Sequence, residues 1–200
     1  MGRRGPGPWV AIVNGSRRPG DPAPRAVTAR VTSRDRSVAP APVSVPTPGP
    51  RRSPEEQARL ESEIRTLFEQ RVSFNQVLGF RVVSLDPEQP RARFEMRPEL
   101  VGHYSYGQLH GGVTAAVLDA MAGYALTLAL AEKHCDEPAS VAVGRFSRIG
   151  TIDLRIDYLR RGIGKWFEAG ARVTRLGGRI GSVQMTLHSD TGALVATGSA

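Results

Sequence analysis

The amino-acid sequence predicts an α+β domain in which a curled antiparallel sheet wraps around one long central helix. A long apolar stretch over residues 108–131 contains His110, Gly111 and Gly112 near its start, and Asp119 is its only carboxylate. Two runs with a strand pattern precede this stretch and four follow it. A long apolar helix among so many strands buries itself only if an antiparallel sheet curls around it.

The chain divides near residue 52 into a tail and a domain. Residues 1–52 hold ten of the 15 prolines, and their ten arginines against two aspartates give a net charge of +8, equal to that of the whole chain. From residue 53 onward, 17 basic and 17 acidic residues balance. We therefore expect a disordered Pro/Arg-rich tail over residues 1–52 and one folded domain over residues 53–200.

The basic charge says little about the folded domain, because its whole excess lies in the tail. The sequence has no zinc-ligand spacing and no helix-turn-helix pattern. The tail would therefore attract polyanions only without specificity, and we expect no specific nucleic-acid partner.

A single cysteine, Cys135, points to a reducing compartment because it can form no internal disulfide. Its surroundings, KHCDEP, are typical of a polar loop and do not support a catalytic thiol. The neighbouring His134 does not make a metal site with it. We therefore expect no bound metal. The apolar run at residues 9–13 is too short for a secretion signal, so we expect a cytoplasmic protein.

The elements before the central helix have clear local signals. Ser53 followed by Pro54 is a well-formed helix start, and apolar residues at helical spacing continue to about Val72. Strand patterns follow at residues 80–86 and 91–97, and a loop leads from there to the central helix.

The elements after the central helix are all strands. Residues 151–159 alternate strictly, which places Ile152, Leu154, Ile156 and Tyr158 on one expected buried face. Further runs at residues 165–177, 179–189 and 193–199 are separated by glycine-containing turns, so the four strands are expected to form a meander.

The start of the central helix is suited to an oxyanion. Gly111 and Gly112 let the backbone approach a ligand closely, and a helix that begins there leaves unpaired N–H groups at its positive end. The alternative is that His110 is an ordinary capping or turn residue.

Asp119 is the second candidate in this helix, because an unpaired buried carboxylate costs several kcal/mol and usually marks function or a specific partner. Nine residues separate it from His110, which corresponds to opposite faces and about 13 Å along the axis. If both residues are catalytic, a symmetric dimer is the simplest way to unite them. A transmembrane span fits the length of the stretch, but Asp119, the many alanines and glycines, and the strands that follow argue against it.

Two segments, LHGGVTAAVLD at 109–119 and TIDLRIDYLR at 151–160, resemble the hotdog-fold acyl-CoA thioesterases, in particular the phenylacetate-pathway thioesterase-like and YigI-like group. The resemblance covers about residues 55–200. It implies hydrolysis of fatty (medium- or long-chain) or aryl acyl-CoA thioesters by a homodimer or a dimer of dimers. It also implies that neither a metal nor an organic cofactor is needed.

The resemblance assigns roles to four residues. The Gly111 N–H would stabilise the developing oxyanion, and His110 would orient the thioester carbonyl or hold the glycine turn. Asp119 of the partner subunit would act as nucleophile or as general base on a water, two mechanisms that stay open. Thr151 would help to position that water or the carboxylate.

Other residues would bind substrate. Several relatives have an asparagine where this chain has Tyr104, and nearby Gln108 is a candidate to replace its hydrogen bond, with Gly112 beside it. Arg160 and Arg161 stand where the family exposes its phosphate-contacting loop, although a solvated strand end is an equally good interpretation. The acyl pocket would be lined by residues such as Met121, Phe74, Val77 and Leu78.

Two rival functions follow from the same resemblance. The departure at Tyr104 is compatible with a noncatalytic acyl-CoA-binding protein, a sensor or an assembly partner, although the presence of Asp119 and Gly111 argues against it. A dehydratase on the same fold is weaker, because no second histidine or acid occurs in the expected context.

Overall fold

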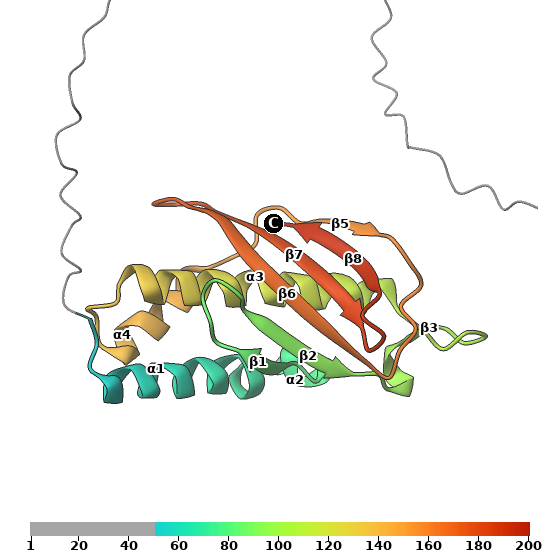
Figure 1. Cartoon of the computed structure of the whole chain (residues 1–200), viewed down its shortest axis with the longest axis horizontal. Coiled ribbons are helices and arrows are strands. Elements are labelled where there is room, and N and C mark those ends of the chain that lie inside the picture. The colour runs from blue at the N-terminus through green and yellow to red at the C-terminus, as the bar shows by residue number, and fades with distance from the viewer. Residues whose placement is uncertain (1–50) are drawn as a thin grey trace, which may run out of the picture. The chain divides into compact units, whose positions relative to one another are not determined.

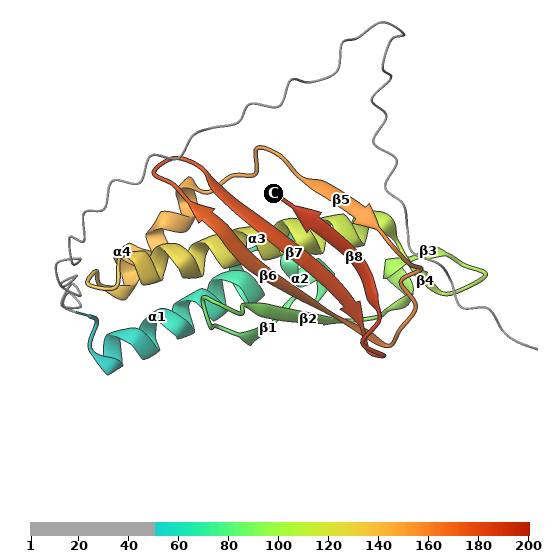
Figure 2. The same cartoon turned by 45° about the horizontal axis from the view of Figure 1, so that its top comes forward.

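The computed structural model describes residues 51–200, and all but the last two residues of the expected tail at 1–52 lie outside them. A six-stranded antiparallel sheet, in the order β1-β2-β6-β7-β8-β5, curls over the long helix α3 (Figures 1 and 2). The predicted hotdog architecture is confirmed. The strands are β1 Arg81–Ser84, β2 Arg91–Glu95, β5 Arg155–Tyr158, β6 Trp166–Leu176, β7 Gly181–Ser189 and β8 Leu194–Ser199.

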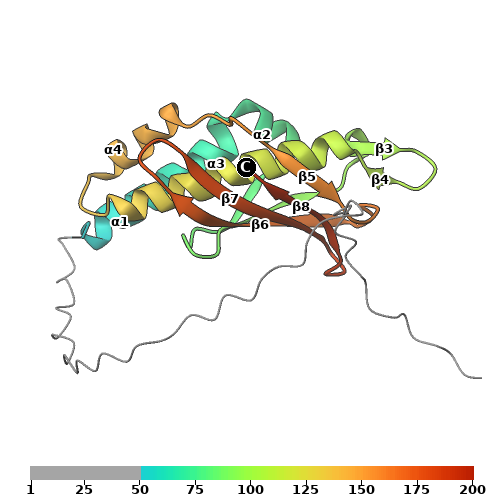
Figure 3. The ribbon, with the colours of Figure 1, turned by 90° about the horizontal axis from the view of Figure 1, so that it is seen from above.

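Helix α3 spans Gly111–Lys133 and lies in the middle layer. It packs against β6 and β7 on one side and against α2 (Ser73–Leu78) and α4 (Ala139–Gly144) on the other (Figure 3). Within residues 51–200, α3 is the one helix that is long and apolar enough to cross a membrane, and half of its most apolar window is buried inside the domain. The membrane interpretation is not needed to explain its apolar character.

Helix α1, Pro54–Thr66, begins as expected, because the Ser53 hydroxyl accepts a hydrogen bond from the Glu56 N–H. It continues as one wide π-helical turn, η1, over Leu67–Arg71. The short helix α2 that follows was not predicted. It ends at Gly79, whose φ of 73° is a left-handed conformation that favours glycine.

The predicted meander of four strands is wrong in one respect. Strands β6, β7 and β8 follow one another, but β5 pairs with β8 at the far edge of the sheet. The reason is that β6 has no free side: β2 occupies one edge and β7 the other. The linker between β5 and β6 therefore crosses the sheet.

Strand β5 is also shorter than the predicted strand at residues 151–159. Of its expected buried face, Leu154 and Ile156 pack against the core, whereas the two outer residues do not. Ile152 is 80% exposed and Tyr158 is 56% exposed. Strand β5 is an edge strand, and within residues 51–200 no element covers Ile152 or Tyr158. These apolar side chains are available to a partner.

Two further pieces of local structure were not predicted. The expected loop before the central helix contains a small hairpin of β3 (Val101–His103) and β4 (Gln108–Leu109), preceded by the 3₁₀ turn η2 at Pro98–Leu100. After α4, a 3₁₀ turn, η3, covers Arg145–Arg148 and leads to the segment before β5. This segment borders the candidate site.

Aromatic side chains fill the core between α3 and the first elements. Tyr124 is fully buried, packs edge-on against Phe68 and Phe80, and donates its hydroxyl to the Ser84 carbonyl at 2.7 Å. Burial raises the pKa of Tyr124, so the folded protein keeps it neutral.

Arg52, the last residue of the expected tail, is held at the end of α3. Its guanidinium donates to the carbonyls of Ala131, His134 and Glu137 at 2.6–2.7 Å. These carbonyls lie at or beyond the carboxyl end of the helix, where a cation is favourable.

Candidate active site

The imidazole of His110 caps the start of α3. The imidazole Nδ1 accepts a hydrogen bond from the Gly112 N–H at 2.9 Å. The main-chain carbonyl of His110 accepts hydrogen bonds from the N–H groups of Val113 and Thr114. A neutral imidazole that accepts at Nδ1 carries its proton on Nε2. His110 is exposed, so its Nε2–H is available to a ligand at the helix start.

The N–H of Gly111 makes no hydrogen bond to any atom of residues 51–200. It lies at the first position of the helix, where the macrodipole is positive. The helix start therefore offers two neighbouring donors, the Gly111 N–H and the His110 Nε2–H, to an oxygen atom that gains negative charge.

Tyr158, which no sequence argument selected as a site residue, supports this arrangement. Its hydroxyl donates to the Gly111 carbonyl at 2.8 Å. That carbonyl belongs to the peptide group whose N–H, on Gly112, donates to His110. The three groups form a hydrogen-bonded chain that fixes the tautomer of His110. The strand alternation places Tyr158 but gives no signal for this contact.

Asp119 and Thr151 meet although 32 positions separate them in the sequence. The Thr151 hydroxyl donates to the Asp119 carboxylate, with 2.6 Å between Oγ1 and Oδ1. Asp119 is half-buried, and Thr151 is its partner. The side of α3 that carries Asp119 faces the segment before β5, which leaves the carboxylate partly open to solvent.

A cavity of about 240 Å³ lies beside this pair. Most of its wall is apolar, and it is lined by Phe68, Val72, Phe74, Asn75, Ala116, Asp119, Ala120, Gly123, Phe146, Ile149, Gly150 and Thr151.

Of the four pocket residues expected from the sequence, only Phe74 lines this cavity. Met121 and Leu78 are buried in the core, and Val77 is exposed and does not line this cavity. Met121 lies in the core, and an almost wholly apolar helix does not reveal from its sequence which of its sides lines a cavity.

The other expected binding residues lie around the helix start, away from Asp119. Arg161 stacks on the Tyr106 ring at 4.6 Å, and Arg160 donates to the Leu194 carbonyl at 3.3 Å. Tyr104 is 91% exposed at the hairpin tip, and Gln108 lies opposite His103 in that hairpin.

The two halves of the candidate site do not meet within one chain. The helix start at His110 and the carboxylate of Asp119 are nine residues apart on the same helix, or about 13 Å along its axis. The part of the chain that the structure describes contains no cluster of three or more His, Cys, Asp or Glu side chains suited to a metal.

Comparisons with known proteins show the family to which the chain belongs. The sequence model of the thioesterase superfamily matches residues 106–196. The medium/long-chain acyl-CoA thioesterase YigI of Escherichia coli (strain K12) is 33% identical over 134 residues, which cover 67% of this chain and 86% of YigI.

The chain belongs to the thioesterase superfamily.

Solved structures of similar proteins share the fold of this thioesterase. A protein of Shewanella oneidensis related to the thioesterase superfamily aligns with a TM-score of 0.67 and 35% identity, over 72% of this chain and 94% of its own. A structure from Syntrophus aciditrophicus aligns with a TM-score of 0.64 and 31% identity, over 72% and 95%. The family expected from the HGG and TIDLR segments is confirmed.

Proposed function

We propose that this thioesterase hydrolyses acyl-CoA thioesters, with the oxyanion stabilised by the start of α3 in one subunit and the reaction driven by Asp119 of the other. The observation that carries the proposal is the Asp119–Thr151 pair at an apolar cavity, on the helix whose start presents unpaired donors. The activity of the YigI relative supports acyl-CoA as the substrate.

In the general-base route, the Asp119 carboxylate takes a proton from water, and the resulting hydroxide attacks the thioester carbonyl. The oxyanion accepts hydrogen bonds from the Gly111 N–H and the His110 Nε2–H. When it collapses, the carbon–sulfur bond breaks and the CoA thiolate leaves. In the nucleophilic route, the Asp119 carboxylate attacks the thioester carbonyl and the carbon–sulfur bond breaks, so that the CoA thiolate leaves and an anhydride forms. Water then hydrolyses the anhydride and regenerates the carboxylate. Thr151 holds the carboxylate in both.

A two-fold dimer supplies what one chain lacks, because each site needs a helix start and a carboxylate that are separated along α3. The uncovered apolar residues at the β5 edge, Ile152 and Tyr158, provide surface for such a contact. The apolar cavity beside Asp119 suits a medium or long acyl chain, since Phe68, Phe74 and Phe146 line it.

The first experiment follows release of free CoA from acyl-CoAs of increasing chain length and from aryl-CoAs. We expect turnover with medium or long chains, and a loss of about 10²- to 10⁴-fold in kcat for Asp119→Asn, which keeps an oxygen for the Thr151 hydroxyl. The matched control is Asp136→Asn, an exposed aspartate outside the site.

Tight acyl-CoA binding without turnover would favour the noncatalytic rival, and undiminished turnover in Asp119→Asn would refute the mechanism. Hydration of an enoyl-CoA would favour the dehydratase.

Mixed dimers test the shared site. Asp119→Asn and Gly111→Pro chains are each expected to keep about 1% of the activity or less, because one lacks the carboxylate and the other lacks an oxyanion donor in every site. Their heterodimer regains one complete site out of two, so co-expression with two affinity tags should restore about half of the activity per dimer. No recovery in purified heterodimers would place both halves in one chain.

A further inference from the structure

Asn75 is a buried polar residue in the wall of the cavity beside Asp119, and the proposed mechanism does not use it. It lies in α2 and is 3% exposed. Apart from Asn75 and the bonded pair of Asp119 and Thr151, the side chains that line this cavity are apolar. A carboxamide in such a wall is costly unless its polar atoms are hydrogen-bonded.

The orientation of the Asn75 carboxamide follows from the hydrogen bond that it makes. Its Nδ2 donates to the Phe68 carbonyl, in the π-helical turn η1, at 3.1 Å. A carbonyl oxygen only accepts hydrogen bonds, so the nitrogen must be the atom that faces Phe68. The Oδ1 points in another direction, and no group in residues 51–200 donates a hydrogen bond to it.

The Asn75 Oδ1 is accessible to a ligand. In residues 51–200, the side-chain nitrogen and oxygen atoms that are sealed inside the protein without a partner are Arg93 Nε and Asp190 Oδ1, and the Asn75 Oδ1 is not one of them. Because the rest of Asn75 is buried and the residue lines the cavity beside Asp119, the accessible part of Oδ1 faces this cavity. The cavity therefore contains a hydrogen-bond acceptor that the protein leaves unused.

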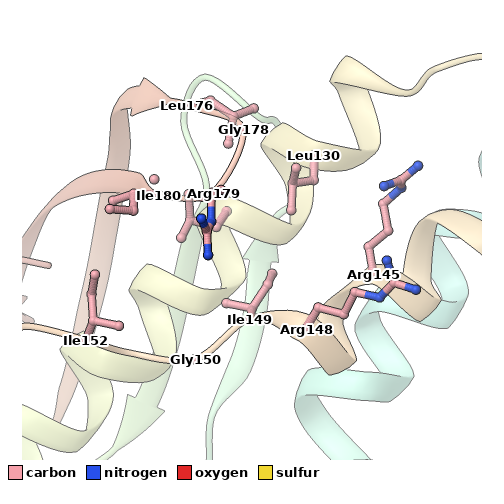
Figure 4. Close-up of a pocket in the computed structure, with 13 residues that line it drawn as sticks. Leu130, Arg145, Arg148, Ile149, Gly150, Ile152, Leu176, Gly178, Arg179 and Ile180 are labelled. Atoms are coloured by element: carbon pink, nitrogen blue, oxygen red, sulfur yellow. The ribbon is translucent and has the colours of Figure 1, made fainter.

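A second cavity, of about 290 Å³, lacks such an acceptor. It lies between the end of α3, η3 and the β6–β7 turn, and Ile149 and Gly150 line both cavities (Figure 4). The polar side chains in its lining are Arg145, Arg148 and Arg179, which only donate hydrogen bonds. The two cavities thus differ in the polar group that they present to a ligand.

The unused acceptor requires a donor from the ligand. An ammonium group is a poor candidate, because its buried charge would need a free carboxylate, and the acid in the lining, Asp119, is already bonded to Thr151. A hydroxyl is a small uncharged donor that leaves the rest of an acyl chain apolar. A plain chain would cover the Asn75 Oδ1 without supplying a donor, and a buried acceptor left unsatisfied costs free energy.

We propose that Asn75 selects acyl-CoA substrates whose acyl chain carries a hydroxyl group, and that this hydroxyl donates to the Asn75 Oδ1 inside the cavity. The similarity to the medium/long-chain acyl-CoA thioesterase YigI supports an aliphatic chain. The inference rests on the proposed function, in which the acyl group occupies this cavity.

The test compares medium-chain acyl-CoAs of one length, either plain or with a single hydroxyl at successive carbons. At the carbon that lies beside Asn75, the hydroxylated substrate should have a kcat/KM about tenfold above that of the plain chain, a factor that corresponds to about 1.4 kcal/mol. In Asn75→Leu, which has nearly the same size but no polar atom, this preference should disappear. Asn75→Ala is the second variant, and thermal unfolding checks the fold of both.

The matched control is Thr127→Val, which also removes a buried polar group. Thr127 is 2% exposed and donates to the Gly123 carbonyl at 2.8 Å, but it does not line the cavity. Its variant should therefore keep the wild-type ratio of kcat/KM between hydroxylated and plain substrates. Equal losses for both substrates in Asn75→Leu would indicate a purely structural role and overturn the proposal.

Calorimetric binding of the free acids separates this proposal from the catalytic one, because it needs no turnover. A hydroxy fatty acid should bind about tenfold more tightly than the plain acid to the wild type and equally tightly to Asn75→Leu, even if the protein hydrolyses no thioester. A wild type without preference for a hydroxyl at any carbon, in both binding and turnover, would overturn the proposal. A preference confined to aryl groups with a ring hydroxyl would overturn the assignment to aliphatic chains.

Discussion

Replacement of Gly111 by proline should remove one hydrogen-bond donor, the main-chain N–H, from the candidate oxyanion site and leave the fold intact. Gly111 is the first residue of α3, the position where proline is favoured in helices. His110 before it has φ −65° and ψ 134°, an extended conformation that tolerates a following proline. A Cβ on Gly111 meets the Tyr158 ring at 3.5 Å, an ordinary contact.

The only hydrogen-bonding change is the loss of the Gly111 N–H, which has no partner within residues 51–200. Loss of one preorganised oxyanion donor costs about 10²- to 10³-fold in kcat, or roughly 2.7–4 kcal/mol. Stability should not fall, because a compatible proline stabilises a protein by about 0.4–1 kcal/mol. The assay is CoA release under saturating acyl-CoA, with thermal unfolding as the check on the fold.

Gly111→Ala is the matched control, since it adds the same Cβ and keeps the N–H. The ratio of the two kcat values therefore isolates the donor from any crowding of the substrate. Equal activity in the proline and alanine variants, with both folded, would refute the oxyanion role of this N–H.

Three other predictions concern hydroxyl groups. Thr151→Val should lower kcat about tenfold, because the Asp119 carboxylate loses a charge-assisted hydrogen bond, and Thr151→Ser should restore most of the rate. Tyr158→Phe should lower kcat by less than about tenfold with KM unchanged, and ¹⁵N NMR should show a mixed tautomer for the cap histidine. Tyr124→Phe should cost about 1–2 kcal/mol in urea unfolding at neutral pH, since the Ser84 carbonyl loses its donor. Because burial raises the pKa of Tyr124, wild-type stability should fall above about pH 10, the range of an unfolded tyrosine, and the variant should lack that fall.

Local signals were enough to predict most element positions. The serine and proline at residues 53 and 54 specify a helix start through their own hydrogen bonding and backbone angles, and His110-Gly111-Gly112 does the same for α3. The π-helical turn at Leu67–Arg71 has no such signal, because its residues also suit an α-helix.

The position of β5 depends on the rest of the sheet. Its alternating pattern predicts a strand. The pattern does not predict that β2 and β7 occupy both sides of β6, so that β5 pairs with β8 at the edge of the sheet. The sequence also does not show which elements pack against this strand, and for that reason Ile152 and Tyr158 were expected to be buried.

For the candidate site, the residue types and spacing were sufficient to select Asp119 and the helix start, since glycines after a histidine and an acid in an apolar helix are locally unusual. The sequence could not say which arginines meet at the second cavity. Arg148 and Arg179 are far apart in the chain and share a cavity only because η3 and the β6–β7 turn both face the end of α3.

The segment at Ile149 and Gly150 is a common wall of the two cavities. A ligand that displaces this wall on one side changes the shape of the space on the other, so the free energies of binding in the two cavities would be coupled. Coupling of this kind is reciprocal.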